Sequence, residues 1–175
     1  MLQKQRVYII GMMGVGKTTI GRRLANQLGF SFHDLDQIIE TKNNKKIHQI
    51  FEEKSEEYFR NLESSALKSF QNLNSVLATG GGTPIFFNNL DWMLNSGVVV
   101  WFQLPLKMMA QRIIQSKEKR PLASANSEIE LQQQLETIYK EREKFYQKAH
   151  FIIETKNVSS EKLKNLANQI KNQLK

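Results

Sequence analysis

The sequence contains no cysteine, which excludes disulfide bonds and thiolate metal sites. Its three histidines, His33, His48 and His150, are far apart and form no zinc-binding pattern, so we interpret them as structural or surface residues. No apolar run approaches the length of a transmembrane helix, and residues 1–6, which lead into a strand, do not resemble a signal peptide. These absences fit a cytoplasmic protein and predict no membrane association.

Acidic residues are also few. The sequence has 17 aspartates and glutamates against 25 lysines and arginines, which gives a net charge of +8. Such a balance is typical of proteins that bind nucleic acids or phosphorylated and carboxylated small ligands. Many of the lysines within residues 140–175 lie on the outer faces of expected helices, where solvation explains them. No stacking motif of the RRM or cold-shock kind is present, so we expect no nucleic-acid partner.

The 175 residues suggest a single domain in which short apolar strands alternate with helical patterns. Strands are expected at residues 6–10, 30–35, 75–79, 98–102 and 151–153. Helical patterns separate them, including one over residues 86–94. This alternation predicts an α/β fold with a five-stranded parallel sheet in a three-layer α/β/α arrangement, in which ligands bind beyond the carboxyl ends of the strands.

A glycine-rich stretch from Gly11 to Thr19 follows the pattern G-x-x-x-x-G-K-T, which is the P-loop or Walker A motif. A β-branched run precedes it, and a helical apolar repeat from Ile20 to Leu28 follows. The glycines therefore lie between a strand and a helix N-terminus, where backbone N–H groups and the helix dipole attract phosphate. Lys17 is expected to reach the outer phosphates, and the Thr18 hydroxyl to hold Mg²⁺. The alternative is a glycine-rich turn with a chance lysine.

Asp34 and Asp36 stand at the expected end of the second strand, and in an extended conformation they would project to the same side. One carboxylate can order Mg²⁺ through water, because this ion keeps much of its hydration shell. The other can accept a hydrogen bond from a hydroxyl group that is to be phosphorylated. A turn or a helix cap is the alternative, but the position downstream of a P-loop favours function.

Two arginines are candidates for binding a carboxylate. Arg60 has Glu56 and Glu63 as helical neighbours, so Glu63 can orient Arg60 toward a substrate carboxylate, or the glutamates can form a surface ion pair. Arg142 falls within an apolar helical row, where a charge must be paired. Either an internal acid or a bound anion pairs with Arg142, and the anion is favoured because a ligand pocket must lie near the strand ends.

Two further stretches have a functional and a structural interpretation. Gly80-Gly81-Gly82 directly follows a strand, which indicates either close approach of a ligand to the backbone or a strained turn. Arg120 stands in a polar segment, residues 117–129, that we interpret as an exposed excursion. An arginine on a closing lid can neutralise transferring phosphate charge, but a solvated basic loop explains Arg120 equally well.

Together these motifs resemble the shikimate kinase family over nearly the whole chain. The resemblance includes the P-loop, the D-x-D of Asp34–Asp36, the F-R-x-x-E of Phe59–Glu63, the triple glycine, the R-P-L of Arg120–Leu122 and the R-x-x-x-Y of Arg142–Tyr146. The P-loop alone indicates only nucleotide binding, whereas the combination is much more specific. The sequence departs from the family pattern at Ser55, Ala123 and Gln147, none of which is an expected ligand.

The resemblance implies a P-loop kinase that uses ATP and Mg²⁺ to phosphorylate the 3-hydroxyl of shikimate in aromatic amino acid biosynthesis. It implies that ATP is bound by Gly14, Val15, Gly16, Lys17, Thr18, Thr19 and Arg120. It implies metal binding by Thr18 and Asp34, catalysis by Lys17, Asp36 and Arg120, and shikimate binding by Asp36, Arg60, Gly80, Gly81, Gly82 and Arg142. Another small P-loop kinase, such as a gluconate or nucleoside monophosphate kinase, is the alternative. Arg60 and Arg142 suit one carboxylate plus hydroxyls, whereas a monophosphate kinase should offer more arginines.

The expected organisation is a single P-loop kinase domain over residues 1–175. We expect a mobile lid at about residues 117–130 and a helical substrate-binding region at about residues 36–63. We also expect a monomer whose partners are the small molecules shikimate and ATP.

Overall fold

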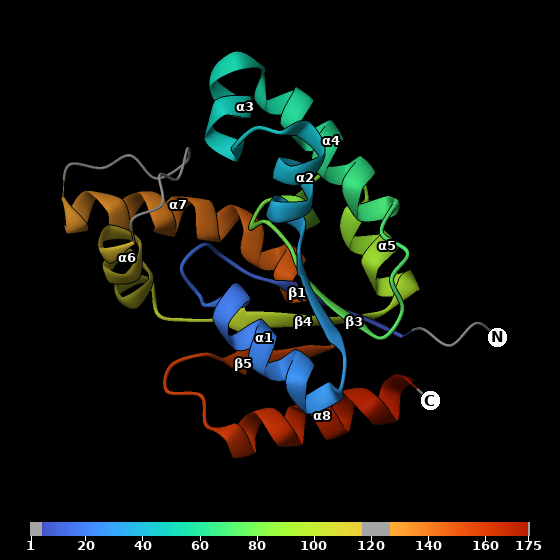
Figure 1. The fold of residues 1–175 in the computed structure, drawn as a ribbon. Helices are drawn as coiled ribbons and strands as arrows, with labels where there is room; N and C mark the ends of the chain where they lie inside the picture. Colours follow the sequence, from blue (N-terminus) through green and yellow to red (C-terminus); the bar gives the residue numbers. More distant parts are fainter. Residues whose placement is uncertain (1–4, 117–126, 175) are drawn as a thin grey trace.

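The computed structural model describes residues 5–116 and 127–174, which form a parallel sheet with helices around it (Figure 1). The strands are β1 (Arg6–Ile10), β2 (Ser31–Asp34), β3 (Ser75–Ala78), β4 (Val98–Gln103) and β5 (Phe151–Glu154). The helices are α1 (Lys17–Leu28), α2 (Leu35–Asn43), α3 (Ile47–Glu53), α4 (Glu56–Lys68), α5 (Asn89–Ser96), α6 (Leu106–Gln115), α7 (Glu128–Tyr146) and α8 (Ser160–Leu174), with a short 3₁₀ turn, η1 (Thr83–Ile85).

The five strands run parallel in the order β2-β3-β1-β4-β5, which confirms the predicted sheet. The central strand β1 pairs with β3 and with β4, with Val7 beside Val76 on one side and beside Val98 on the other. Its residues Val7 to Ile10 are fully buried, as expected for a strand covered on both faces. This position makes β1 the rigid base from which the phosphate loop leaves the sheet.

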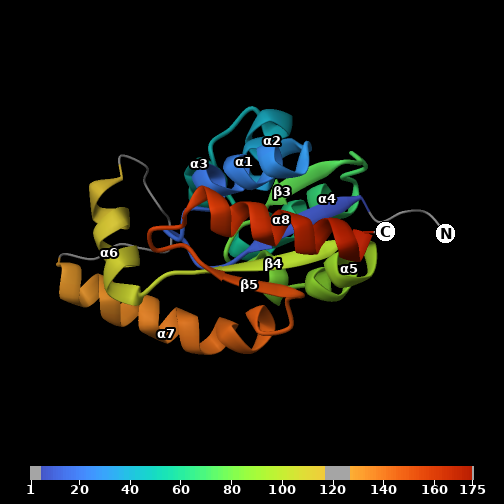
Figure 2. The same ribbon diagram turned by 90° about the horizontal axis from the view of Figure 1, so that it is seen from below.

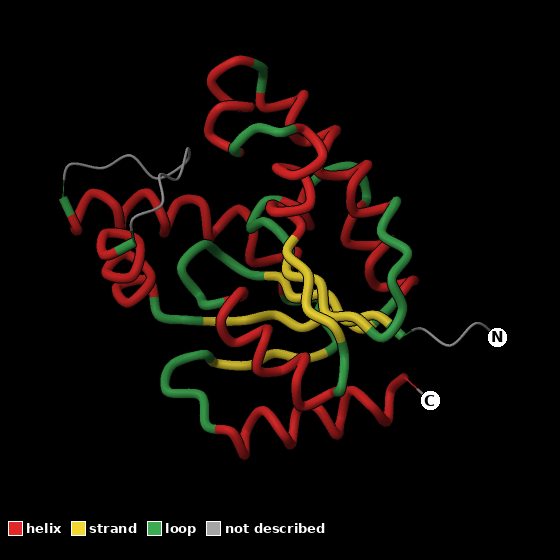
Figure 3. The backbone as a smooth tube through the Cα atoms, in the orientation of Figure 1, coloured by secondary structure: helices red, strands yellow, loops and turns green. Residues whose placement is uncertain are grey.

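Helices cover both faces of the sheet, as Figures 1 and 2 show from two directions. Helices α1 and α8 pack together on one face, and α5 and α7 lie on the other. The apolar repeat from Ile20 to Leu28 forms the buried face of α1, as its periodicity predicts. Helices α2 and α3 and the start of α4 form a lobe at the top of Figure 1. Figure 3 shows the strands in yellow, each followed by a loop or helix at its carboxyl end.

Two expected boundaries are wrong. The second strand ends at Asp34, because the Asp34 side chain caps α2 and starts the helix at Leu35. Residues 86–94 are not one helix, because η1 precedes this stretch and Phe87 and Asn88 adopt positive φ angles of 50° and 56° before α5 begins. Helix α4 begins after Ser55, whose hydroxyl accepts a capping hydrogen bond from the Tyr58 N–H.

No helix within residues 5–116 or 127–174 combines the length and apolar character needed to cross a membrane. Helix α7 begins at Glu128, inside the stretch expected as an excursion, because Ser127 accepts a capping hydrogen bond from the Glu130 N–H. Arg120 and most of the expected lid, residues 117–126, lie outside the described residues.

Candidate active site

The phosphate loop joins β1 to α1 and combines three features that attract an anion. Gly11, Gly14 and Gly16 have φ angles of 135°, 78° and 93°, which side chains with a Cβ rarely adopt, so the loop curls tightly. Gly16 caps α1, whose N-terminus carries a partial positive charge. Lys17 turns back over the curl and donates hydrogen bonds from Nζ to the carbonyls of Gly11 and Met12, at 2.8 and 2.7 Å. The ammonium group therefore lies against the backbone of the loop.

Two residues outside the predicted motifs hold this loop from behind. Arg112, on α6, donates from Nη1 to the Gly14 carbonyl at 3.3 Å. Thr155, which is buried just after β5, has its hydroxyl 2.8 Å from the Val15 carbonyl. Both residues donate hydrogen bonds to backbone carbonyls. Sequence analysis missed them because the pattern of side chains gives no sign of such contacts.

Asp34 connects the phosphate loop to α2. Its Oδ2 accepts a hydrogen bond from the Thr18 hydroxyl at 3.0 Å, and its Oδ1 accepts one from the Asp36 N–H at 3.1 Å. Asp34 is therefore a helix cap, which is the alternative considered from the sequence, and it also lies against the phosphate loop. The expectation of two extended aspartates is wrong, because Asp36 lies in the first turn of α2.

The pair of Thr18 and Asp34 has the chemistry of a magnesium site. A hydroxyl and a carboxylate supply oxygen ligands from two elements at one place, and Mg²⁺ is commonly held by one or two protein oxygens with water completing its shell. No group of three or more histidine, aspartate or glutamate side chains suited to a metal occurs in the described part of the chain. The oxygen pair fits Mg²⁺ and would leave most of its coordination sphere to water and phosphate.

The loop after β3 brings the acceptor-site candidates together, because each of its three glycines lies against one of them. A Cβ built on Gly82 would lie 2.6 Å from Arg60 Nη1, and one built on Gly81 would lie 3.1 Å from Arg142 Nη1, so both close approaches depend on glycine. A Cβ built on Gly80 would meet Glu63 Oε1 at 2.6 Å, with Asp36 Oδ1 at an ordinary contact distance of 3.5 Å. Residues more than a hundred positions apart in the sequence thus surround one short backbone segment.

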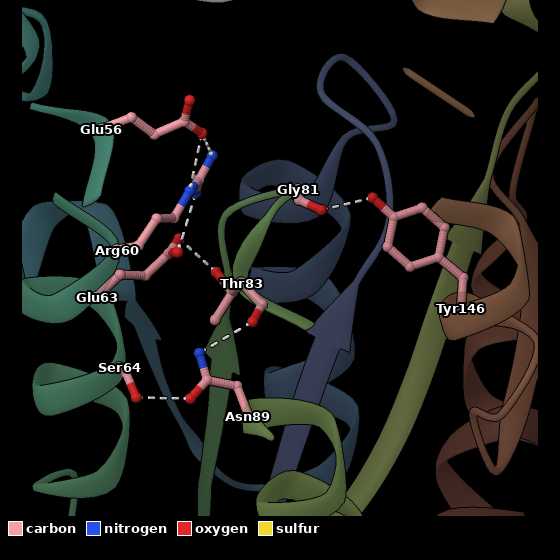
Figure 4. Close-up of polar contacts among 8 residues, drawn as sticks. All are labelled: Glu56, Arg60, Glu63, Ser64, Gly81, Thr83, Asn89 and Tyr146. Atoms are coloured by element: carbon pink, nitrogen blue, oxygen red, sulfur yellow. Dashed lines mark hydrogen bonds and ion pairs between the residues drawn. The ribbon is translucent and has the colours of Figure 1, made fainter. Parts of the chain in front are cut away.

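Arg60 is fixed by two glutamates of its own helix (Figure 4). Its Nε and Nη2 donate to Glu56 Oε1 at 3.2 and 3.0 Å, and its Nη1 donates to Glu63 Oε2 at 3.0 Å. The side chain of Arg60 is 5% exposed and that of Glu63 is 1% exposed, whereas that of Glu56 is 52% exposed. The pair of Arg60 and Glu63 is therefore not the surface ion pair considered from the sequence.

A buried polar network ties Glu63 to the glycine loop. The Thr83 hydroxyl donates to Glu63 Oε1 at 2.6 Å, and the Asn89 amide donates to the Thr83 carbonyl at 3.0 Å. Ser64 completes the network by donating to Asn89 Oδ1 at 2.8 Å (Figure 4). Because these groups satisfy one another, the network fixes the position of Glu63 and hence of Arg60. Sequence analysis missed Thr83 and Asn89, which stand in no motif.

Arg142 reaches the same loop from α7. It is half-buried, and it forms no ion pair with any carboxylate in residues 5–116 or 127–174. One turn further along α7, the fully buried Tyr146 donates from its hydroxyl to the Gly81 carbonyl at 2.6 Å. Burial raises the pKa of Tyr146 to about 12, although the positive charge of Arg142 acts in the opposite direction. The described residues therefore supply no internal acid as a partner for Arg142.

Comparisons with known proteins show which family the chain resembles. A family model described as shikimate kinase matches residues 13–175. A shikimate kinase of Parabacteroides distasonis is 37% identical over 158 residues, which cover 90% of this chain and 91% of that protein.

Solved structures give the same result. A shikimate kinase from Bacteroides thetaiotaomicron superposes with a TM-score of 0.86 at 29% identity and with 97% of each chain covered. A shikimate kinase from Acinetobacter baumannii in complex with shikimate superposes with a TM-score of 0.82 at 35% identity, covering 97% of this chain and 92% of that one.

Proposed function

The chain belongs to the shikimate kinase family and is a phosphotransferase that uses ATP to phosphorylate shikimate, and we propose how its residues carry out this reaction. The product is shikimate 3-phosphate, an intermediate of aromatic amino acid biosynthesis. The observation that supports this assignment of roles is the convergence of Asp36, Arg60 and Arg142 on one glycine loop beside the phosphate loop.

The acceptor side binds the carboxylate and hydroxyls of shikimate. Arg142 supplies the positive charge that attracts the carboxylate, because no described carboxylate balances it. Arg60 keeps a fixed orientation between Glu56 and Glu63, and a guanidinium has five N–H donors, of which these glutamates use three. Gly80, Gly81 and Gly82 allow the ring to approach the backbone closely.

The phosphate side binds ATP through the loop. Backbone N–H groups of Gly14 to Thr19 hold the phosphates, and Lys17 exchanges its carbonyl contacts for the outer phosphate oxygens. Thr18 and Asp34 would hold Mg²⁺, which would supply positive charge to neutralise the phosphates. Arg120, which lies outside the described residues, would add a further cation to the transferring phosphoryl group.

In this proposal Asp36 orients the reacting hydroxyl. Phosphoryl transfer through a loose transition state depends on position and charge more than on a strong base. A carboxylate beside Gly80 can accept the hydroxyl hydrogen bond and later its proton, while Lys17 stabilises the charge on the phosphoryl oxygens. The reaction therefore needs Asp36 and the loop on the same edge of the sheet, which the strand order provides.

The wider organisation follows from this assignment. We propose a single P-loop kinase domain over residues 1–175, with a lid at about residues 117–130 and a substrate-binding region at about residues 36–63. We further propose a cytoplasmic monomer that binds shikimate and ATP and no nucleic acid.

A coupled assay of ADP release tests the proposed function and its nearest alternative. We expect turnover with shikimate and none above background with gluconate or nucleoside monophosphates at equal concentrations. Turnover of gluconate in preference to shikimate would contradict the assignment.

Lys17→Met provides the matched test of the phosphate loop. We expect this variant to lose phosphoryl transfer while keeping the melting curve of the parent, because the hydrogen bonds described above join Lys17 to carbonyls of the loop itself. Circular dichroism and the ADP assay on the same preparation check both parts. Retained turnover would refute the role of Lys17.

A further inference from the structure

Tyr146 is the one buried phenol that contacts both loops of the site within the described residues. Its hydroxyl lies 2.6 Å from the Gly81 carbonyl oxygen and 3.7 Å from the Met12 sulfur. Met12 belongs to the phosphate loop, and Gly81 belongs to the glycine loop. The ring also packs against Trp101, with centroids 5.7 Å apart, so both the ring and its hydroxyl are held in place.

The hydrogen bond to Gly81 determines where the next N–H points. The structure contains no cis peptide bond within its described residues, so the Gly81 carbonyl and the Gly82 N–H point in opposite directions from one peptide plane. With the carbonyl turned toward Tyr146, the Gly82 N–H points away from Tyr146. Figure 4 shows that Arg60 lies on that other side of Gly81.

The Gly82 N–H is in the position of a ligand donor. Gly82 is buried, yet no described residue accepts a hydrogen bond from its N–H group. Buried backbone N–H groups are almost always paired, so such a group next to a proposed substrate arginine indicates an acceptor supplied by a ligand.

We infer that Tyr146 is a positioning residue that fixes the Gly81–Gly82 peptide, so that the Gly82 N–H is held ready to donate to an oxygen of shikimate. The inference rests on the proposed function, because it names shikimate as the ligand. Tyr146 does not touch the substrate in this account and acts only through the peptide. Arg142, four residues earlier on α7, is held by the same helix, so one element sets both a charge and a backbone donor.

Tyr146→Phe tests the inference, and Tyr139→Phe is the matched control. Tyr139 lies on the same helix and packs near the same tryptophan, but its hydroxyl donates to Glu143 at 2.9 Å and not to either loop. We expect Tyr146→Phe to raise the KM for shikimate roughly tenfold, the scale of one lost hydrogen bond, while the KM for ATP stays within about twofold. Tyr139→Phe should change neither KM.

The outcomes separate positioning from stability. A lower melting temperature with both KM values unchanged would make Tyr146 a structural residue and overturn the inference, as would an equal rise in both KM values. If the wild type fails to phosphorylate shikimate at all, the proposed function fails first, and the inference fails with it.

A second measurement needs no variant and remains decisive if Tyr146→Phe does not fold. In the wild type, hydrogen exchange of the Gly82 amide, followed by nuclear magnetic resonance, should slow roughly tenfold or more when shikimate saturates the protein. Unchanged exchange of this amide at saturating shikimate would overturn the inference.

Discussion

Arg60 and Arg142 face the same glycine loop from α4 and α7, yet their charges are balanced in different ways. Arg60 is almost fully buried and donates three hydrogen bonds to two glutamates, and its guanidinium lies over the Phe86 ring at 4.6 Å. Arg142 is half-buried and has no carboxylate partner within the described residues. One arginine is part of the folded structure, and the other keeps its charge available.

This difference separates two requirements of binding a small anion. A guanidinium that is already neutralised adds little net attraction, but its fixed direction presents its remaining N–H groups in one geometry. An unbalanced guanidinium attracts the anion, and it costs stability until the anion arrives. We therefore expect Arg60 to contribute mainly to the fold and to orientation, and Arg142 mainly to affinity.

The largest expected effect is on stability, at Arg60. Arg60→Leu leaves Glu63 buried with a charge whose remaining hydrogen-bond donor among the described residues is the Thr83 hydroxyl, and breaking such a pair costs about 3–5 kcal/mol. Urea unfolding measures the loss. Glu56→Gln removes only the half-exposed partner and should cost less than about 1 kcal/mol. If Arg60→Leu unfolds at the same urea concentration as the wild type, Arg60 does not stabilise the fold through its pair with Glu63.

A second variant identifies the cause of that loss. In Arg60→Leu combined with Glu63→Gln, the unpaired charge is gone, but an acceptor remains for the Thr83 hydroxyl. Most of the lost stability should return. A double variant that is less stable than Arg60→Leu alone would show that packing of the arginine, and not the stranded charge, was responsible.

The opposite pattern is expected at Arg142. Arg142→Leu removes an unbalanced charge, so the melting temperature of the empty protein should be kept or raised. Shikimate binding should weaken by about 2–5 kcal/mol, the scale for removing one partner of a buried charge pair. Titration calorimetry and thermal melts on the same preparation measure both. A collapsed melt with unchanged affinity would reverse the comparison.

Sequence reasoning predicted the parts of this site that depend on local patterns. The spacing of Gly11, Gly14 and Gly16 between a strand and a helix was enough to predict the phosphate loop, because positive φ angles leave a glycine signature. The alternation of strands and helices was enough to predict the parallel sheet. Asp34 was harder to interpret, because aspartate is common both at helix caps and in metal sites, and here its two oxygens accept the capping N–H of Asp36 and the Thr18 hydroxyl.

Other parts depend on tertiary contacts and could not be predicted from sequence. Glu56 and Glu63 are equivalent neighbours of Arg60 in the helical pattern, and only the packing of α4 against Thr83 buries one of them. Arg142 stands in an apolar row, as predicted, but that row faces the glycine loop at this point, so the residue is half-buried. Neither the burial of Glu63 nor the partial exposure of Arg142 can be read from the periodicity of the sequence.

An effect smaller than those of Arg60→Leu and Arg142→Leu is expected on the Arg142 side, at alkaline pH. Burial raises the pKa of Tyr146 from 10.0 to about 12, so between these values only the unfolded chain loses the phenol proton. Unfolding is then favoured as the pH rises, and the contribution of Tyr146, complete below pH 10, should fall by about 2 kcal/mol by pH 11.5. Urea unfolding at pH 9 and pH 11.5 gives the free energy of unfolding of the wild type and of Tyr146→Phe. The difference between the two proteins at each pH isolates Tyr146, because all other titrating groups are common to both. The advantage of the wild type over Tyr146→Phe should shrink between the two pH values, and an advantage that stays constant would mean that the Tyr146 phenol is not buried against the glycine loop as the structure has it.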